Sequence, residues 1–153
     1  MFERFAHEAR EAVTFAVTEA GRRGDRRVST DHLLIGVLHH PGAARTLGTT
    51  ADEVRNLADR LDREALAEVG IDVAAFGPLA PAAGAGRTSF TPGAKDVLRR
   101  ALTHAVSGKS RRIESGHLLL ALEECAEPEP AAVLLACLHR HGGETGRAGH
   151  AGA

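Results

Sequence analysis

The segment Thr30-Asp31-His32 places a hydroxyl, a carboxylate and an imidazole at three successive positions. These are the residue types of a nucleophilic hydrolase, in which the imidazole takes the hydroxyl proton and the carboxylate orients the imidazole. Successive residues of a helix point in different directions, because side chains share a helical face only at spacings of three or four. The three groups therefore cannot form a proton relay, and we do not expect an enzyme.

The tripeptide Gly108-Lys109-Ser110 resembles the end of a phosphate-binding loop. The motif G-x-x-x-x-G-K-[ST] also requires a glycine at position 103, where this chain has Thr103. The preceding residues follow a helical pattern, whereas a phosphate-binding loop follows a strand. We therefore predict a solvated loop and no bound nucleotide.

Nine histidines and two cysteines invite comparison with metal sites. A zinc site needs three or four ligands held at characteristic spacings. Neither the pair His39-His40 nor the group Cys137, His139 and His141 has such a spacing. We expect no metal and no other cofactor.

The elements that carry these residues occur twice. When the sequence is shifted by 85 residues, Phe5 aligns with Phe90 and His32 with His117, with no gap between the two matches. Such self-similarity indicates two copies of one structural unit. Further matches pair Ala9 with Ala94, Ala16 with Ala101, Ala20 with Ala105, Leu33 with Leu118 and Leu34 with Leu119.

Apolar residues recur at intervals of three or four, as expected for helices that bury one face. Thr30 and Thr50 are suited to cap two of these helices, and Pro92 occupies a first helical position, where its missing N–H costs little. The fold class is therefore all-α, with two tandem, pseudo-two-fold-related repeats and about seven or eight helices. The pattern predicts helices over residues 3–20, 30–39, 43–47, 50–68, 92–106, 115–125 and 129–139.

Composition divides the chain into four parts. Residues 77–89 are rich in Pro, Ala and Gly and lack periodicity, which predicts a linker between repeat one, residues 1–76, and repeat two, residues 90–141. Repeat two is expected to be shortened, because Gly142 and Gly143 break the helical pattern where a fourth helix should begin. Residues 142–153 are Gly-rich and polar, which predicts a disordered tail.

Charge and hydropathy exclude two classes of partner. The formal net charge of -1 gives no excess of cations for binding nucleic acid. No apolar run approaches the roughly 20 residues of a membrane-spanning helix, and the charged N-terminus is unlike a signal peptide. We therefore expect a cytoplasmic protein, and the abundance of Ala, Arg and Gly favours a bacterial source.

Four motifs lie at matching positions of the two repeats. They are Met1-Phe2-Glu3-Arg4-Phe5, Ser29-Thr30-Asp31-His32-Leu33-Leu34, Phe90-Thr91-Pro92-Gly93-Ala94-Lys95 and Ser115-Gly116-His117-Leu118-Leu119. Together they resemble the Clp N-terminal repeat domain over about residues 1–138. The resemblance implies a pseudo-two-fold helical bundle, which in Clp unfoldases collects substrates and adaptors while ATPase rings lie elsewhere in the chain. No ATPase sequence follows here, so we expect a free-standing copy.

The resemblance also implies ligand sites where the second helix of each repeat begins. In the family these sites bind phosphorylated arginine through Gly-Thr-Glu-His, in which helix N–H groups favour the phosphate and the Glu can pair with the guanidinium. Here the corresponding residues are Thr30-Asp31-His32 and Ser115-Gly116-His117. Asp31 keeps the carboxylate on a shorter arm and Gly116 has none, so the first site is the better candidate for phosphoarginine.

Two other groups of residues have alternative interpretations. His32 and His117 occupy equivalent positions just inside a helix, which favours a shared structural hydrogen bond over a ligand role. The family's third surface, where the first helices of both repeats meet, can hold cyclic peptide antibiotics, and the matching positions are Phe2, Phe90 and Lys95. Both phenylalanines also lie on apolar faces, where core packing is an equally good explanation. The arginine pairs at 22–23, 26–27 and 111–112 are ordinary for solvated loops but could attract acidic segments of a partner.

Two functions follow from these observations. The first is a non-catalytic protein- or peptide-binding module that acts as an adaptor or regulator of Clp proteolysis, with Clp unfoldase or protease components, or their substrates, as partners. The second is a sequestering protein that binds a peptide-like antibiotic, such as a cyclic peptide, or another small molecule through Phe2, Phe90 and Lys95.

Overall fold

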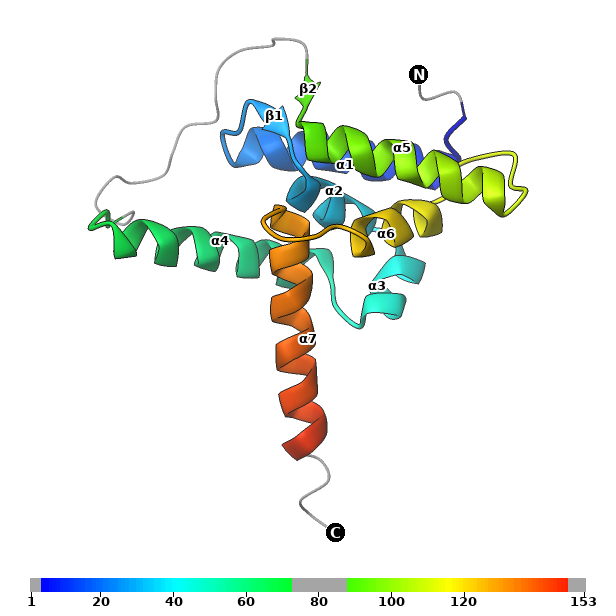
Figure 1. Ribbon diagram of the computed structural model, residues 1–153. Helices are drawn as coiled ribbons and strands as arrows, with labels where there is room; N and C mark the ends of the chain where they lie inside the picture. Colours follow the sequence, from blue (N-terminus) through cyan, green and yellow to red (C-terminus); the bar gives the residue numbers. More distant parts are fainter. Residues whose placement is uncertain (1–3, 73–87, 149–153) are drawn as a thin grey trace.

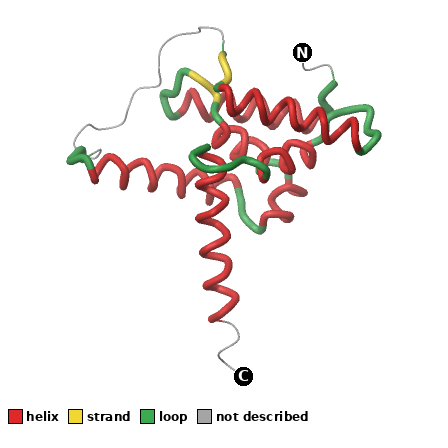
Figure 2. Tube along the Cα trace, viewed as in Figure 1, coloured by secondary structure: helices red, strands yellow, loops and turns green. Residues whose placement is uncertain are grey.

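The computed structural model describes residues 4–72 and 88–148, and within these ranges the fold is helical, as predicted (Figures 1 and 2). Besides the helices there are two short strands, β1 (Arg27–Val28) and β2 (Ser89–Phe90), which pair in parallel. The seven helices are α1 (His7–Arg22), α2 (Thr30–Val37), α3 (Pro41–Leu47), α4 (Ala51–Glu68), α5 (Pro92–Ser107), α6 (Ser115–Glu123) and α7 (Pro130–Ala148).

The two repeats meet through their second helices. Helix α1 packs against α2, α5 packs against α6, and α2 and α6 contact each other in the centre of the molecule. All eight residues of α2 are buried, so this helix is surrounded by its neighbours on every side. The distal parts of α4 and α7 extend away from this centre in different directions (Figure 1). The starts of α2 and α6, where the sequence predicts ligand sites, therefore lie close to the boundary between the repeats.

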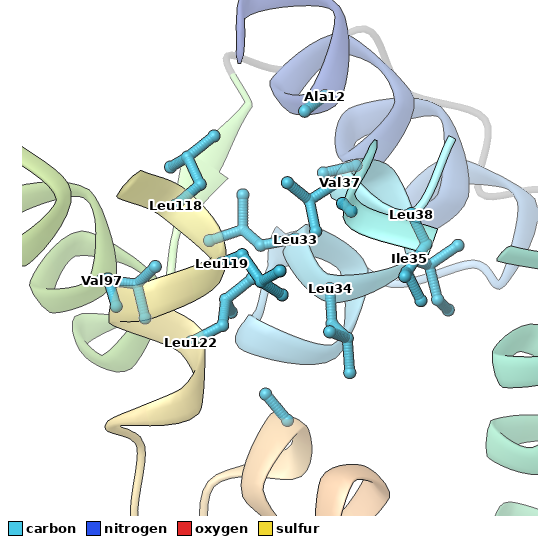
Figure 3. Close-up of a cluster of buried hydrophobic side chains, with 14 of the residues drawn as sticks. Ala12, Leu33, Leu34, Ile35, Val37, Leu38, Val97, Leu118, Leu119 and Leu122 are labelled. Atoms are coloured by element: carbon cyan, nitrogen blue, oxygen red, sulfur yellow. The ribbon is translucent and has the colours of Figure 1, made fainter. Parts of the chain in front are cut away.

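Aliphatic side chains from both repeats form the core. Figure 3 shows Leu33 and Leu34 of α2 facing Leu119 and Leu122 of α6, with Val97 of α5 beside them. Removing these side chains from water supplies the main driving force for folding, at about 25 cal/mol for each Å² of apolar surface. Helix α2 is thus held by contacts with residues that lie more than 80 positions away in the sequence.

A glycine allows α1 and α2 to approach closely. A Cβ atom added at Gly36 would lie 2.2 Å from the backbone oxygen of Ala12 and 3.0 Å from the backbone nitrogen of Ala16. Backbone atoms in a packed helix cannot move aside as a flexible side chain can. The crossing of the two helices therefore depends on the absence of a side chain at position 36.

Each repeat pairs a short extended segment with the other repeat. Phe5, just before α1, forms a parallel bridge with Ile113, the loop residue near the start of α6. In the same way Phe90, just before α5, pairs with Val28, near the start of α2. The shift of 85 residues relates Phe5 to Phe90 and Val28 to Ile113, so the two pairings are equivalent and reciprocal.

Two helix boundaries differ from the sequence predictions by more than two residues. Helix α1 begins at His7 and not near residue 3, because residues 4–6 are engaged in the pairing with Ile113. Helix α7 continues to Ala148, past the predicted end at residue 139 and through residues 142–148 of the predicted disordered tail. Each glycine lowers helix propensity by about 1 kcal/mol relative to alanine, which weakens a helix without fixing its end. The rest of the predicted tail and residues 77–87 of the predicted linker lie outside the described ranges.

Candidate functional site

The Thr30 hydroxyl joins the two repeats. Thr30 is fully buried in the first turn of α2. Its Oγ1 donates to Glu129 Oε2 and accepts from the backbone N–H of Ala131, both at 3.1 Å. These contacts give Thr30 a structural role at the start of α7, and its predicted role in ligand binding stays a prediction.

The equivalent residue of the second repeat, Ser115, makes a corresponding connection. Its Oγ donates to Glu8 Oε2 of α1 at 3.2 Å and lies 3.4 Å from His40 Nδ1, at the start of α3. Ser115 is also buried, with 5% of its surface exposed. Both helix-start hydroxyls thus reach across the repeat boundary, and the binding role predicted for Ser115 is likewise still a prediction.

A serine, a histidine and a carboxylate meet at this point, so their geometry bears on catalysis. Glu8 Oε2 lies 2.5 Å from His40 Nε2 as well as 3.2 Å from Ser115 Oγ. In a catalytic relay the imidazole stands between the hydroxyl and the acid. His40 contacts both groups here, but the hydroxyl donates to the carboxylate at the shorter distance and the serine is buried, so the cluster is a polar link between α1, α3 and α6.

The two helix-start histidines each form the same structural hydrogen bond in their own repeat, as predicted. The backbone N–H of Ser29 donates to His32 Nδ1 at 2.9 Å, and the backbone N–H of Glu114 donates to His117 Nδ1 at the same distance. Each imidazole therefore caps its own helix by satisfying a backbone donor at the helix start. His32 Nε2 additionally lies 2.8 Å from Asp25 Oδ2, which fixes the ring on both sides.

Asp31 is already paired with an arginine of the same chain. Arg23 Nη1 donates to Asp31 Oδ2 at 2.8 Å, and the same guanidinium contacts Asp62 and lies 3.7 Å from Asp59 Oδ1. Burial disfavours the charge of this guanidinium, but the carboxylates of Asp31 and Asp62 outweigh burial and raise the pKa of Arg23. The carboxylate that the family resemblance assigns to an external guanidinium is thus occupied by Arg23.

A shallow pocket of about 420 Å³ lies beside this ion pair. Its lining includes Asp31 and His32 as well as Arg26, Arg27 and Thr91. The pocket therefore offers both carboxylate and guanidinium groups to a ligand. At Gly116, the corresponding position of the second repeat, no carboxylate is available, and a Cβ there would meet no heavy atom within 4 Å.

A second pocket, of about 300 Å³, lies between the N-terminal segment and α5. Its apolar lining comes from Phe5 and Ile113, which are the paired residues of the two repeats, and from Leu98 and Leu102 on α5. Three cationic side chains complete the lining: Arg4, Lys95 and Arg99. We refer to these seven residues as the α5 pocket.

Among the residues predicted for the third surface, the structure places one in this pocket. Lys95 lines the α5 pocket. Phe90 lies in β2, partly buried against the core, and is not among the lining residues. Phe2 lies outside the described residues.

Other kinds of site are not found in the described part of the chain. No group of three or more His, Cys, Asp or Glu residues there could hold a metal ion. No helix there has both the length and the hydropathy of a membrane span. The two pockets described above contain residues that the sequence predicted for ligand binding, which are Asp31 and His32 in one and Lys95 in the other.

Residues 4–137 match the protein family described as the Clp repeat (R) N-terminal domain. The chain belongs to the Clp N-terminal domain family. In Clp chaperones this domain is the module that binds substrates and adaptors. The match covers both repeats and both pockets.

Relatives with this domain are much longer proteins. The chain is 27% identical over 139 residues to an ATP-dependent Clp protease ATP-binding subunit ClpA homolog of Cyanidium caldarium. That alignment covers 88% of this chain and 14% of the relative, so the chain spans about one seventh of its length.

Solved structures of Clp N-terminal domains have the same fold. The N-terminal domain of the chaperone ClpD from Arabidopsis thaliana superposes with a TM-score of 0.62 at 23% identity, covering 93% of this chain and 89% of that one. The Hsp104 N-terminal domain from Candida albicans gives a TM-score of 0.58 at 15% identity, covering 92% of this chain and 83% of that one. At these identities the likeness establishes the fold of this Clp N-terminal domain.

Sequence reasoning missed several residues of these sites. Leu98 and Leu102 follow the apolar helical period and are indistinguishable in sequence from core residues, although both are only partly buried. Arg23 belongs to an arginine-rich loop that is usually solvated, and its partner Asp62 lies 39 positions away. Only the fold of the Clp N-terminal domain brings these residues together.

Proposed function

We propose that this Clp N-terminal domain is a non-catalytic recognition module that binds polypeptide segments in the α5 pocket. The observation that carries the proposal is the lining of that pocket. Leu98 and Leu102 present apolar surface in an open depression of about 300 Å³ whose lining also includes the buried Phe5 and Ile113, beside charged groups that can orient a ligand. Concave apolar sites with a few convergent polar groups are the usual form of a ligand site.

Clp components and their substrates are the partners we propose. Family members use this domain to receive substrates and adaptors, and the α5 pocket lies on the domain itself. A chain with such a pocket can act as an adaptor or regulator of Clp proteolysis by holding a segment of a substrate, or a segment of the unfoldase. Both roles require binding without catalysis. The hydrogen bond that the Ser115 hydroxyl donates to Glu8 agrees with this, because it engages the hydroxyl in a structural contact.

The test is the binding of a permanently unfolded, fluorescently labelled polypeptide, followed by anisotropy, to the unaltered protein and to two variants of α5. Leu102→Ser places a hydroxyl in the apolar lining, and we expect it to weaken binding about tenfold, which corresponds to about 1.4 kcal/mol. Val106→Ser is the matched control, because Val106 lies on the same helix with 65% of its surface exposed and does not line the pocket. Equal affinities of the two variants would refute binding in the α5 pocket.

The second function is sequestration of a peptide-like small molecule in the same pocket. A volume of about 300 Å³ is at the lower end for sites that enclose small ligands. Titration calorimetry with a cyclic peptide known to bind Clp N-terminal domains distinguishes the two functions. Tight binding of the macrocycle that is lost in Phe2→Ala or Lys95→Ala, without binding of the unfolded polypeptide, would favour sequestration.

The pocket beside Asp31 is a second candidate site, with phosphoarginine as its ligand. Arg26 and Arg27 provide cations for a phosphate, and Asp31 and His32 also line the pocket. The ion pair between Arg23 and Asp31 opposes this binding, because the ligand's guanidinium would have to displace Arg23 from the carboxylate.

A further inference from the structure

Three cations line the α5 pocket, and two of them have no acidic partner among the described residues. Arg4 and Lys95 are exposed at the pocket, and neither forms an ion pair with another described residue. Arg99 contacts Asp96 at 3.3 Å, in a pair whose side chains are both well exposed. Water screens such an exposed pair, so it is worth at most about 1 kcal/mol and leaves the guanidinium available to a ligand.

The loop before α6 extends this basic surface. The N–H of Ile113 donates to the backbone oxygen of Arg4 at 2.8 Å, so the loop runs directly beside the N-terminal segment. Arg111 and Arg112 precede Ile113, are exposed, and form no ion pair with another described residue. The acidic residues closest in sequence to these cations are Glu3, which precedes Arg4, Asp96, which is shared between Arg99 and Arg100, and Glu114, which follows Ile113.

The junction of α1 and α4 is a contrast, because three arginines there are paired with carboxylates. Arg22, Arg23 and Arg55 all contact acidic side chains at the junction of α1 and α4. With a net charge of only -1, the chain has enough carboxylates to neutralise its cations. The cations around the α5 pocket are therefore a local excess and not a consequence of a basic composition.

From this charge distribution we infer that the segment bound in the α5 pocket is acidic. The occupant is a polypeptide stretch that places one bulky apolar side chain against Leu98 and Leu102 and flanking Asp or Glu side chains beside Arg4, Lys95 and Arg99. The inference rests on the proposed function and specifies the chemistry of its ligand. Complementary charge of this kind raises association rates and selects among partners, and it weakens as salt is added.

The experiment compares three fluorescent peptides that share a central Leu-Phe pair and differ only in their flanks, which are Asp and Glu, Asn and Gln, or Lys and Arg. Anisotropy titrations at about 50 mM salt, where the Debye length is roughly 14 Å, measure their affinities for the unaltered protein. We expect the acidic peptide to bind at least about tenfold more tightly than the neutral one, and this ratio to shrink severalfold at about 500 mM salt.

Variants of the pocket cations test which side chains cause the preference for the acidic peptide. Lys95→Gln and Arg4→Gln are each expected to lower the affinity for the acidic peptide about threefold to tenfold while leaving the neutral peptide unchanged. Arg45→Gln is the matched control, because Arg45 is an exposed cation on α3 that does not line the pocket. Thermal melting of each variant confirms that it is folded.

The possible negative results distinguish failure of the acidic preference from failure of the proposed function. Equal binding of the acidic and neutral peptides, with both weakened by Leu102→Ser, would overturn the acidic preference and leave the proposed function intact. Equally strong competition by a single-stranded oligonucleotide would also overturn it, because the surface would then recognise charge alone. Binding of none of the peptides, whatever their flanks, would refute the proposed function itself.

Discussion

The side-chain oxygen of Thr30 accepts a hydrogen bond from the backbone N–H of Ala131 at 3.1 Å, which joins the first turn of α2 to the first turn of α7. These two residues lie 101 positions apart in the sequence and belong to different repeats. The same hydroxyl donates to Glu129, so one side chain satisfies a buried backbone N–H and a half-buried carboxylate of the other repeat. Loss of this hydroxyl therefore affects the boundary between the repeats.

Replacement of Thr30 by Val tests this connection. The variant keeps the shape of the side chain but leaves the Ala131 N–H without its acceptor, and we expect the free energy of unfolding to fall by about 2 kcal/mol. Urea denaturation followed by circular dichroism measures the loss. Thr30→Ser is the control, since it retains the hydroxyl and lacks the methyl group. A Val variant as stable as the unaltered protein would contradict the structural role of the hydroxyl.

Gly36→Ala tests the close crossing of α1 and α2. The added Cβ would lie 2.2 Å from the backbone oxygen of Ala12, so the helices must separate, and we expect a loss of about 3 kcal/mol. Gly116→Ala is the matched control in α6, where the added methyl meets open space and should stabilise the helix by about 0.5 to 1 kcal/mol. Thermal melting of both variants gives the comparison. An unchanged melting temperature for Gly36→Ala would contradict the proposed tight contact.

Glu19 should make the stability depend on pH. Burial favours the neutral acid, but hydrogen bonds from Arg22 at 2.7 Å and Arg55 at 3.0 Å outweigh burial and lower the pKa of Glu19 below its usual 4.5. A carboxyl whose pKa is lowered by folding stabilises the protein above its unfolded-state pKa, and this contribution is lost as the pH falls through the folded-state value. We expect Glu19→Gln to cost about 2 kcal/mol at pH 7. The difference from the unaltered protein should shrink as the pH falls below 4.5.

Removal of Arg23 should improve phosphoarginine binding. Arg23 competes with the guanidinium of the ligand for Asp31, so Arg23→Ala is expected to raise the affinity for free phosphoarginine at least about tenfold, as measured by calorimetry. Adding Asp31→Asn to this variant should abolish the gain. Arg22→Ala is the control, because Arg22 pairs with Glu19 and Asp59 and does not line the pocket. No difference between the two arginine variants would exclude Arg23 as the determinant.

The helices could be predicted because their signals are local. The capping pair Thr50 and Glu53 and the apolar period together predicted α4 to within one residue. The capping residue of α2 was predicted wrongly as Thr30. The N-cap is Ser29, and the hydroxyl of Thr30 is directed to α7. A two-residue strand has no alternating pattern to detect, so the pairing of Val28 with Phe90 appears only in the folded chain.

The sites were less predictable than the fold because their residues come together only through tertiary structure. Equivalence in the repeat predicted the shared hydrogen bond of His32 and His117, since its partner is a nearby backbone group of the same helix start. The cluster of Glu8, His40 and Ser115 spans 107 positions and has no sequence signature. The partner of a charged side chain is therefore the feature that sequence patterns specify least.

The reciprocal pairing of Phe5 with Ile113 and of Val28 with Phe90 means that neither repeat is complete by itself. A polypeptide with a single copy would leave two extended segments unpaired, the one before its first helix and the one before its second helix. It could pair both segments only with an identical partner. The result is an isologous dimer with a two-fold axis. The present chain is the fused counterpart of such a dimer, in which covalent linkage makes association independent of concentration and leaves each half free to diverge, as Asp31 and Gly116 have done.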